Sequence, residues 1–238
     1  MRSKLLGRKA SRSRQQPLPL KRHGGPRPGS GRKPGPGRRR ASHKRRPVVT
    51  GRYPVHVTVR MRRDVPGLRN FERAHVLQNA FVKGCDKPGF RICQFSIQGN
   101  HVHLVCEASS ADRLARGMQG WSIRVARGLN RKVGRTGSIF FERYGATVIK
   151  TPSQMRNTLC YVLQNARRHG ADLDRRWHGV DPFSSAWWFD GWAHERWRNG
   201  LAPADDRPVA TARSWLLTAG WRRRGLIGVT EVPPAARP

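Results

Sequence analysis

The chain of 238 residues is long enough for one sizeable hydrophobic core with appendages, and its 48 Lys and Arg against 14 Asp and Glu give a formal net charge of +34. Because such a charge repels itself unless a polyanion neutralises it, we expect nucleic acid as the partner. No run reaches the ~18 apolar residues of a membrane-spanning helix and the start of the chain lacks an apolar signal segment, so we exclude a membrane protein and expect a cytoplasmic one.

The first 50 residues form a strongly basic segment. They contain 17 Lys and Arg and no Asp or Glu, and they are rich in Gly and Pro without any apolar period. Such a segment cannot bury enough apolar surface to offset the entropy of ordering, so we predict a disordered basic arm over residues 1–50. Its stretch GRKPGPGRR supplies Arg32, Lys33, Arg38 and Arg39 as candidate DNA contacts in a minor groove. The other interpretation is a tail that raises non-specific affinity by counterion release.

From residue 51 the pattern is that of a folded domain. Segments in which apolar and polar residues alternate predict strands, and segments with apolar residues at helical spacing predict helices. The predicted strands are residues 55–61, 90–98, 101–107 and 146–150, and the predicted helices are residues 68–84 and 111–130. This β-α-β-β-α-β order predicts an α+β, ferredoxin-like or RRM-like fold, in which both helices cover one face of an antiparallel sheet. The other face is expected to be open.

Two histidines lie on the third predicted strand, in the stretch QGNHVHLVCE. The apolar residues that alternate with them should meet the helices, so His101 and His103 point together to the open face. In this topology the third strand pairs with the first, whose polar side carries His56 and Thr58, so a cluster of three histidines is expected. For the His-x-His pair taken alone, ordinary surface histidines are an equally good interpretation.

The segment 151–170 predicts an added helix that carries a tyrosine. Thr151 is suited to the N-cap and Pro152 to the first helical position. At about 100° per residue, Tyr161 lies roughly 140° from the centre of the apolar stripe of this helix. Asn165 lies one turn further on, while Gln164 projects farther outward. If this helix covers the open face, a phenol, an amide and two imidazoles can converge; otherwise Tyr161 is better interpreted as a surface aromatic.

The two motifs together resemble those of the single-tyrosine HUH transposases, in particular the REP-associated tyrosine transposases of bacteria. That family combines a His-hydrophobic-His strand with a following helix that bears the nucleophilic tyrosine. The stretch NHVHLVCE matches the first motif through His101 and His103, and YVLQN matches the second through Tyr161 and Asn165. The likeness spans about residues 51–170, which we therefore predict to be the transposase domain.

The resemblance implies a metal-dependent endonuclease and strand transferase that acts on single-stranded or hairpin DNA through a 5′-phosphotyrosine intermediate. It implies that Tyr161 is the catalytic nucleophile. It further implies that Mg²⁺ or Mn²⁺ is bound by His101, His103 and Asn165, with Gln164 as the alternative third ligand. We expect a monomer located at the bacterial nucleoid.

Two other functions stay open at this stage. A noncatalytic regulatory protein derived from a transposase could bind hairpin DNA with the same fold and charge. An RNA-binding module of the same topology is a weaker alternative, because such modules carry stacking aromatics where this sheet carries histidines.

The remaining basic and aromatic features suit substrate handling or simple packing. At the end of the second predicted helix lie four candidate phosphate contacts, Arg124, Arg127, Arg131 and Lys132, for which a solvated helix face is an equal interpretation. The segment 171–238 holds seven of the eight tryptophans and is predicted to be a packed extension.

Tyr144 is a weaker candidate nucleophile. The four cysteines form no CxxC pair and are predicted to be reduced core thiols.

Overall fold

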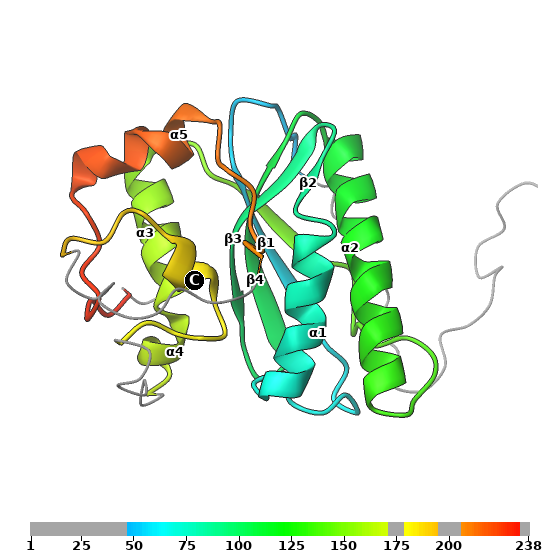
Figure 1. The fold of residues 1–238 in the computed structure, drawn as a ribbon. Helices are drawn as coiled ribbons and strands as arrows, with labels where there is room; N and C mark the ends of the chain where they lie inside the picture. The colour runs from blue at the N-terminus through cyan, green and yellow to red at the C-terminus, as the bar shows by residue number, and fades with distance from the viewer. Residues whose placement is uncertain (1–46, 171–178, 195–205, 234–238) are drawn as a thin grey trace, which may run out of the picture. The chain divides into compact units, whose positions relative to one another are not determined.

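The computed structural model describes residues 47–170, 179–194 and 206–233 (Figure 1). The strands are β1 (Val55–Arg60), β2 (Asp86–Lys87), β3 (Phe90–Ile97), β4 (His101–Ala108) and β5 (Gly145–Val148). The α-helices are α1 (Phe71–Val82), α2 (Ala111–Lys132), α3 (Pro152–Leu163), α4 (Asn165–Arg168) and α5 (Trp215–Thr218), and two short 3₁₀ helices are η2 (Ser185–Trp188) and η4 (Gly220–Arg224). The predicted arm contacts Arg32, Lys33, Arg38 and Arg39 lie outside the described residues.

The strands form one antiparallel sheet in the order β2-β3-β4-β1-β5. Without the two-residue edge strand β2, the chain runs β-α-β-β-α-β and β4 pairs with β1, so the predicted α+β topology is confirmed. No helix in the described part of the chain combines the length and the apolar character needed to cross a bilayer.

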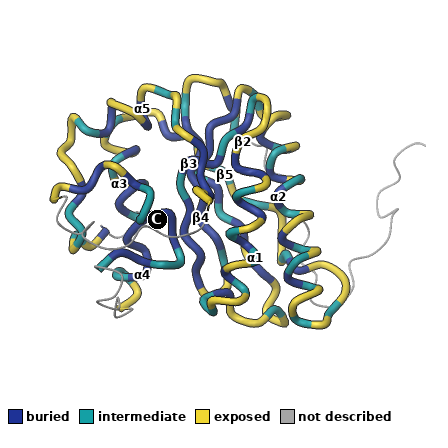
Figure 2. The backbone as a smooth tube through the Cα atoms, in the orientation of Figure 1, coloured by how far each residue is buried: buried dark blue, intermediate teal, exposed yellow. Residues whose placement is uncertain are grey.

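Two hydrophobic clusters cover opposite faces of this sheet. On β4, Val102 and Leu104 belong to the cluster of α1 and α2, whereas Val105 belongs to the cluster of α3. Figure 1 shows α1 and α2 on one side of the sheet and α3 on the other, and Figure 2 shows the strands between them largely buried. The face that α1 and α2 leave open is therefore covered by α3 and by the segment that follows it.

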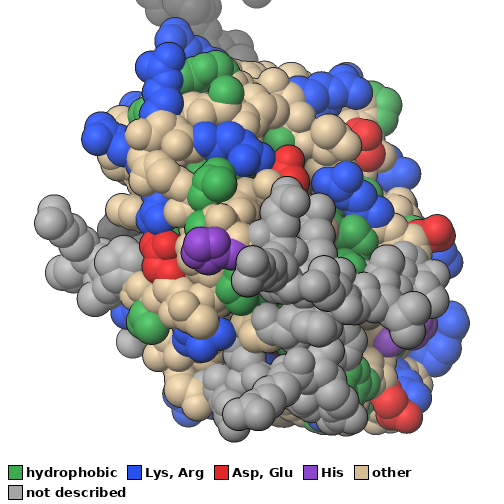
Figure 3. Space-filling model, turned by 60° about the vertical axis from the view of Figure 1, so that its left-hand side comes forward, with side chains coloured by type: hydrophobic (Ala, Val, Ile, Leu, Met, Phe, Trp, Pro, Cys, Tyr) green, Lys and Arg blue, Asp and Glu red, His purple; other side chains and the backbone are tan. Residues whose placement is uncertain are grey.

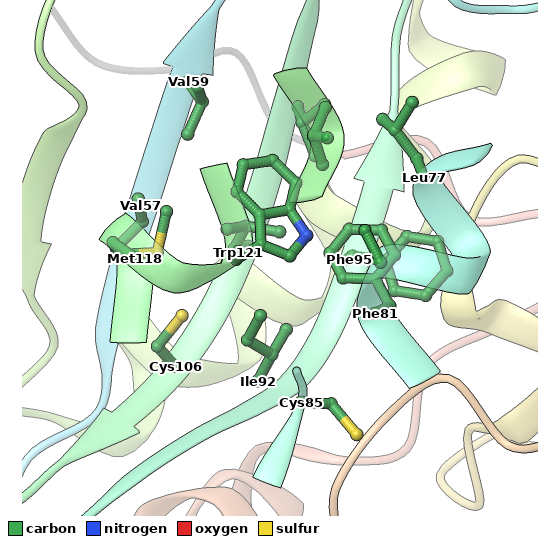
Figure 4. Packing of buried hydrophobic residues seen from close by; sticks show 14 of the residues in the cluster. Val57, Val59, Leu77, Phe81, Cys85, Ile92, Phe95, Cys106, Met118 and Trp121 are labelled. Carbon is green, nitrogen blue, oxygen red and sulfur yellow. The ribbon is translucent and has the colours of Figure 1, made fainter. Parts of the chain in front are cut away.

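Stacked aromatic rings form the centre of the larger cluster (Figure 4). Phe81 of α1 stacks on Phe95 of β3 and on Trp121 of α2, with ring centroids 4.1 and 5.4 Å apart. All three side chains are fully buried. Aromatic pairs at such separations stabilise by more than their buried area alone, so these contacts hold both helices to the sheet.

Helix α1 begins later than the sequence predicts. The Asn70 side chain accepts hydrogen bonds from the N–H groups of Glu72 and Arg73 and so caps the helix there. Leu68 is buried ahead of the helix, and Phe71 is 63% exposed at the first turn. The predicted start at residue 68 was therefore wrong by three residues, because the helix is capped at Asn70.

The C-terminal segment packs against α3 as a hydrophobic extension. Trp192 and Trp221 are buried in the α3 cluster, and the Trp221 ring lies 5.4 Å from that of Phe189, centroid to centroid. The indole N–H of Trp192 donates to the carbonyl of Ala186 at 3.0 Å. Packing, the interpretation that the sequence favours, therefore accounts for these two tryptophans, while Trp215 is half-exposed.

All four cysteines are free and buried. Burial raises the pKa of the Cys160 thiol to about 12, so this thiol is protonated at neutral pH. The prediction of reduced core thiols is confirmed.

Two glycines in the middle of α2 should respond to alanine in opposite ways. A Cβ at Gly117 would overlap the ring of the buried Phe90, whereas one at Gly120 would meet only the movable guanidinium of Arg124, at 3.2 Å. Alanine is favoured over glycine inside a helix by about 1 kcal/mol, so Gly120→Ala should stabilise the protein by up to that amount. Gly117→Ala should destabilise it by about 1–3 kcal/mol because Phe90 must move. Urea unfolding followed by circular dichroism measures both, and equal stability of the two variants would contradict the packing described.

Candidate functional site

His101 and His103 project from β4 toward α3, and their Nε2 atoms lie 3.0 Å apart. His103 is only 5% exposed, and His101 is half-buried. The Nδ1 atom of His101 lies 2.8 Å from Oδ1 of Asn100. A proton on that Nδ1 donates to the amide oxygen, which leaves the Nε2 lone pair of His101 directed at His103.

The other nitrogen of His103 faces strand β1. Its Nδ1 lies 3.2 Å from Nε2 of His56 and 3.2 Å from Oγ1 of Thr58. The antiparallel register places Thr58 opposite His103 and Arg60 opposite His101. The expected cluster of three histidines is therefore present. Arg60 is a further neighbour that the sequence pattern did not single out: its alternation with apolar residues was visible, but only the strand register places it beside His101.

Tyr161 points from α3 into the same cluster. Its Oη lies 3.5 Å from Nε2 of His103, and its ring stands edge-on to those of His103 and His56, with centroids 5.0 and 6.1 Å away. The structure thus brings the predicted nucleophile and the predicted histidines together. Tyr144, the weaker candidate, packs with the cluster of α1 and α2 on the opposite face of the sheet.

The two candidate amide ligands at the end of α3 differ in their surroundings. Gln164 Nε2 donates to the carbonyls of Gly228 and Val229 at 3.0 and 2.6 Å, which ties this side chain to the C-terminal segment; its Oε1 is buried without a partner. Both polar atoms of the fully buried Asn165 side chain lack a hydrogen-bond partner. An unpaired buried amide costs about 1–3 kcal/mol. A ligand bound to the amide of Asn165, one turn after Tyr161, would remove this cost.

Helix α3 is anchored by the C-terminal segment. The Arg156 guanidinium binds both carboxylate oxygens of Glu231 at 2.8 and 2.9 Å, and the Cys160 thiol donates to the same carboxylate at 3.5 Å. The hydrogen bonds from Arg156 lower the pKa of Glu231 below its usual range. These contacts fix the helix that carries Tyr161.

Glu107 stabilises the fold rather than the site. Its buried carboxylate pairs with Arg91 at 2.9 Å and accepts hydrogen bonds from the backbone N–H groups of Arg213 and Ser214. All of its observed partners are structural, so its proximity to the histidines in sequence has no counterpart in their hydrogen-bond network.

The spacing of the histidine pair fits a divalent cation. Two nitrogen ligands at right angles around a metal, each about 2.1 Å from it, lie ~3.0 Å apart, which matches the separation of the Nε2 atoms of His101 and His103, 3.0 Å. If both rings carry their protons on Nδ1, two lone pairs face each other, and a cation between them removes the repulsion. Within residues 47–170, 179–194 and 206–233, no group of three or more His, Cys, Asp and Glu side chains is arranged to hold a metal ion. The fit therefore rests on the spacing of the two imidazoles.

The three clustered histidines are neutral at neutral pH. Burial lowers the pKa of His103 to about 2 and that of His56 to about 4. Burial, and secondarily the nearby Arg60, also lowers the pKa of His101. Neutral imidazole is the form that binds metals, so burial keeps these three imidazoles in the form that a metal would require.

The predicted phosphate contacts of α2 lie on the other side of the sheet. These residues are Arg124, Arg127, Arg131 and Lys132, and with Lys83, which caps the C-terminus of α1, they line a groove of about 550 Å³ between the two helices. All five side chains are exposed, and Lys132 pairs with Glu72 at 3.2 Å. The structure thus groups these four residues with each other and separates them from the histidine–tyrosine cluster.

No protein-family model matches the chain, and no curated protein does so. Among solved structures, the chain is similar to a REP-associated tyrosine transposase bound to a REP hairpin, at 19% identity and a TM-score of 0.48, over 73% of this chain and 99% of that one. It is also similar to a presumed transposase from Deinococcus radiodurans R1, at 12% identity and a TM-score of 0.35, over 47% of this chain and 87% of that one. The first belongs to the family that the motifs resemble. Both TM-scores are below 0.5, so the chemistry of the site rests on the geometry above.

Acid should destabilise the fold through His56. Its pKa is about 4 in the folded chain against an ordinary value of 6.5, so below pH 6.5 the unfolded chain takes up a proton that the folded chain does not. The free energy of unfolding should therefore be unaffected by this group above pH 6.5 and fall by up to about 3 kcal/mol as the pH drops from about 6.5 to 4. His56→Gln removes this contribution.

Urea unfolding at pH 7.5 and 4.5 tests this dependence. The free energy of unfolding of His56→Gln minus that of wild type should be larger at pH 4.5 than at pH 7.5. His75→Gln, at an exposed position on α1, is the control and should show the same difference from wild type at both. An unchanged difference for His56→Gln as well would contradict the assignment.

Proposed function

We propose that the protein is a metal-dependent single-stranded DNA endonuclease and strand transferase of the tyrosine HUH type, acting on hairpin DNA through a 5′-phosphotyrosine intermediate. The observation that carries the proposal is the position of the Tyr161 Oη, 3.5 Å from Nε2 of His103, a nitrogen that also lies 3.0 Å from Nε2 of His101. A phenol beside two neutral, convergent imidazoles is suited to covalent attack on a phosphodiester at a cation site.

His101, His103 and Asn165 would hold Mg²⁺ or Mn²⁺, and the two nitrogen ligands favour Mn²⁺ in affinity. When bound, the cation supplies Lewis-acid chemistry that polarises the scissile phosphodiester and screens its charge. Asn165 is preferred to Gln164 as the third ligand because the Gln164 amide is already bonded to the C-terminal segment, whereas the Asn165 amide is unpaired.

Tyr161 would supply the nucleophile. Its Oη forms a bond to phosphorus, the bond from phosphorus to the 3′ oxygen breaks, and that oxygen leaves as a hydroxyl with the proton that the phenol gives up. Because a phenol is a better leaving group than an alkyl alcohol, a 3′-hydroxyl can later attack the phosphotyrosine and rejoin the strand without nucleotide hydrolysis. Arg60, which is exposed and lies beside His101 in the sheet register, would contact the phosphate.

The positive charge on both sides of the sheet suits a substrate that contacts both. The groove between α1 and α2 gathers five cationic side chains, of which one is paired with Glu72. Lys and Arg side chains also lie around the face that Figure 3 shows, on the side of α3 and the C-terminal segment. A hairpin stem on the groove, with its single-stranded flank passing around an edge of the sheet to Tyr161, would use both surfaces.

A single chain would suffice for this reaction, because Tyr161 reaches histidines of its own chain. We therefore propose a monomer that acts in cis on bacterial DNA at the nucleoid.

A covalent adduct tests the proposed function. Hairpin oligonucleotides with single-stranded flanks and a label at the 3′ end, incubated with the protein and Mn²⁺, should give a denaturant-stable protein–DNA adduct. Tyr161→Phe should abolish the adduct because it removes the attacking oxygen, whereas Tyr144→Phe, on the opposite face of the sheet, should retain it. His101→Ala and His103→Ala should abolish cleavage but keep most of the charge-driven binding.

The outcome also decides between the two DNA-binding functions. Tight hairpin binding by the wild-type protein without any adduct, under conditions where Mn²⁺ is bound, would favour a noncatalytic hairpin-binding regulator.

Removing two arginines from the groove should weaken DNA binding without affecting chemistry. Each lost phosphate contact reduces the slope of log affinity against log salt concentration by about 0.9, so Arg127→Ala with Arg131→Ala should reduce the slope by about 2. Adduct formation at saturating DNA should be retained. Arg113→Ala with Arg116→Ala is the matched control, because these exposed arginines lie at the other end of α2, where Arg116 pairs with Asp112 at 3.0 Å. An equal reduction of the slope in both double variants, measured by fluorescence anisotropy, would exclude specific DNA binding in the groove.

A further inference from the structure

The imidazole of His103 has different partners on its two nitrogens. Nδ1 lies 3.2 Å from both His56 Nε2 and Thr58 Oγ1, while Nε2 lies 3.0 Å from His101 Nε2 and 3.5 Å from Tyr161 Oη. A neutral imidazole carries its proton on one nitrogen only. The partners on the Nδ1 side therefore influence whether the Nε2 lone pair is available for a metal.

Strand β1 holds both Nδ1 partners in place. Thr58 is the register partner of His103, and His56 is that of Val105, two residues along the ladder and on the same side of the sheet. Both side chains are half-buried, and burial lowers the pKa of His56 to about 4, so His56 is neutral at pH 7. A neutral imidazole and a hydroxyl can each accept a hydrogen bond from an N–H group.

We infer that His56 and Thr58 are positioning residues for His103, which accept the hydrogen bond from its Nδ1–H and so keep its Nε2 unprotonated and directed toward the cation beside Tyr161. The inference rests on the proposed function and adds to it two residues that touch neither the cation nor the reacting atoms. The Nδ1 of His101 has its own acceptor, Asn100 Oδ1, at 2.8 Å. Both ligand imidazoles thus have an acceptor for the second N–H, as metal-binding histidines usually do.

The loss of both acceptors has a specific consequence at this spacing. With no partner at Nδ1, the proton of His103 can move to Nε2 and donate to Nε2 of His101, 3.0 Å away. That hydrogen bond occupies the Nε2 atoms of both imidazoles that would bind the cation. The metal site would then be blocked by a tautomer change, without any loss of a ligand residue.

Mn²⁺ binding in the absence of DNA tests the inference on the full chain. The affinity is measured by titration calorimetry or by the electron paramagnetic resonance of free Mn²⁺, and the His103 tautomer is read from ¹⁵N NMR of the imidazole nitrogens. His56→Leu with Thr58→Val removes both acceptors and should weaken Mn²⁺ binding about 10–100-fold, the usual effect of losing such outer partners. The proton of His103 should move from Nδ1 to Nε2.

The conservative variants separate positioning from packing. His56→Gln and Thr58→Ser retain an acceptor oxygen at each place, so Mn²⁺ affinity and the Nδ1–H tautomer should stay close to those of wild type. His75→Leu, at an exposed position on α1, is the control for loss of a histidine that could bind Mn²⁺ non-specifically. Where the double variant fails to fold, Thr58→Val alone is nearly isosteric, and a shift of the His103 proton toward Nε2 in it supports the inference.

Failure of this inference is distinguishable from failure of the proposed function. Unchanged Mn²⁺ affinity and an unchanged His103 tautomer in the folded variants would overturn the positioning role, even if wild type forms the Tyr161 adduct. If the wild-type protein binds no Mn²⁺ and forms no adduct, the proposed function fails, and the inference fails with it.

Discussion

The antiparallel pairing of β1 with β4 determines the composition of the candidate site. Its register sets Thr58 against His103 and Arg60 against His101, so one strand supplies the two histidines and the neighbouring strand supplies the groups around them. Because side chains alternate between the faces of a strand, the same pairing sends the valines of β1 into the core beneath α1 and α2. A slip of one residue would exchange these two sets of side chains. The core therefore enforces the register, and the register builds the site.

The tyrosine is positioned by a separate set of contacts. Helix α3 lies on the opposite face of the sheet from α1 and α2 and is held there by its own hydrophobic cluster, to which the C-terminal segment contributes Trp192 and Trp221. Polar anchors fix it further, through Arg156 to Glu231 and Gln164 to the carbonyls of Gly228 and Val229. The C-terminal segment thus contributes to the proposed chemistry indirectly, because it holds the helix that brings the phenol to His103.

Burial and charge have complementary roles in this molecule. The histidines are withdrawn from water, which lowers the pKa of His103 to about 2 and keeps its imidazole neutral. Several cationic side chains, in contrast, lie at the surface, among them Arg60, Arg124 and Arg127.

Local pattern alone determined the element types of the sheet, the face on which His101 and His103 lie, and the rotation of Tyr161 away from the apolar stripe, because the periods of strands and helices are fixed by backbone geometry. It placed the start of α1 three residues too early, ahead of the Asn70 cap, and it left Gln164 and Asn165 unresolved. Only the tertiary structure decided that α3 covers the histidine face, that Gln164 bonds to the C-terminal segment, and that the α2 arginines lie across the sheet from the tyrosine. These depend on contacts between segments distant in the chain, and no local period encodes which distant partner a side chain meets.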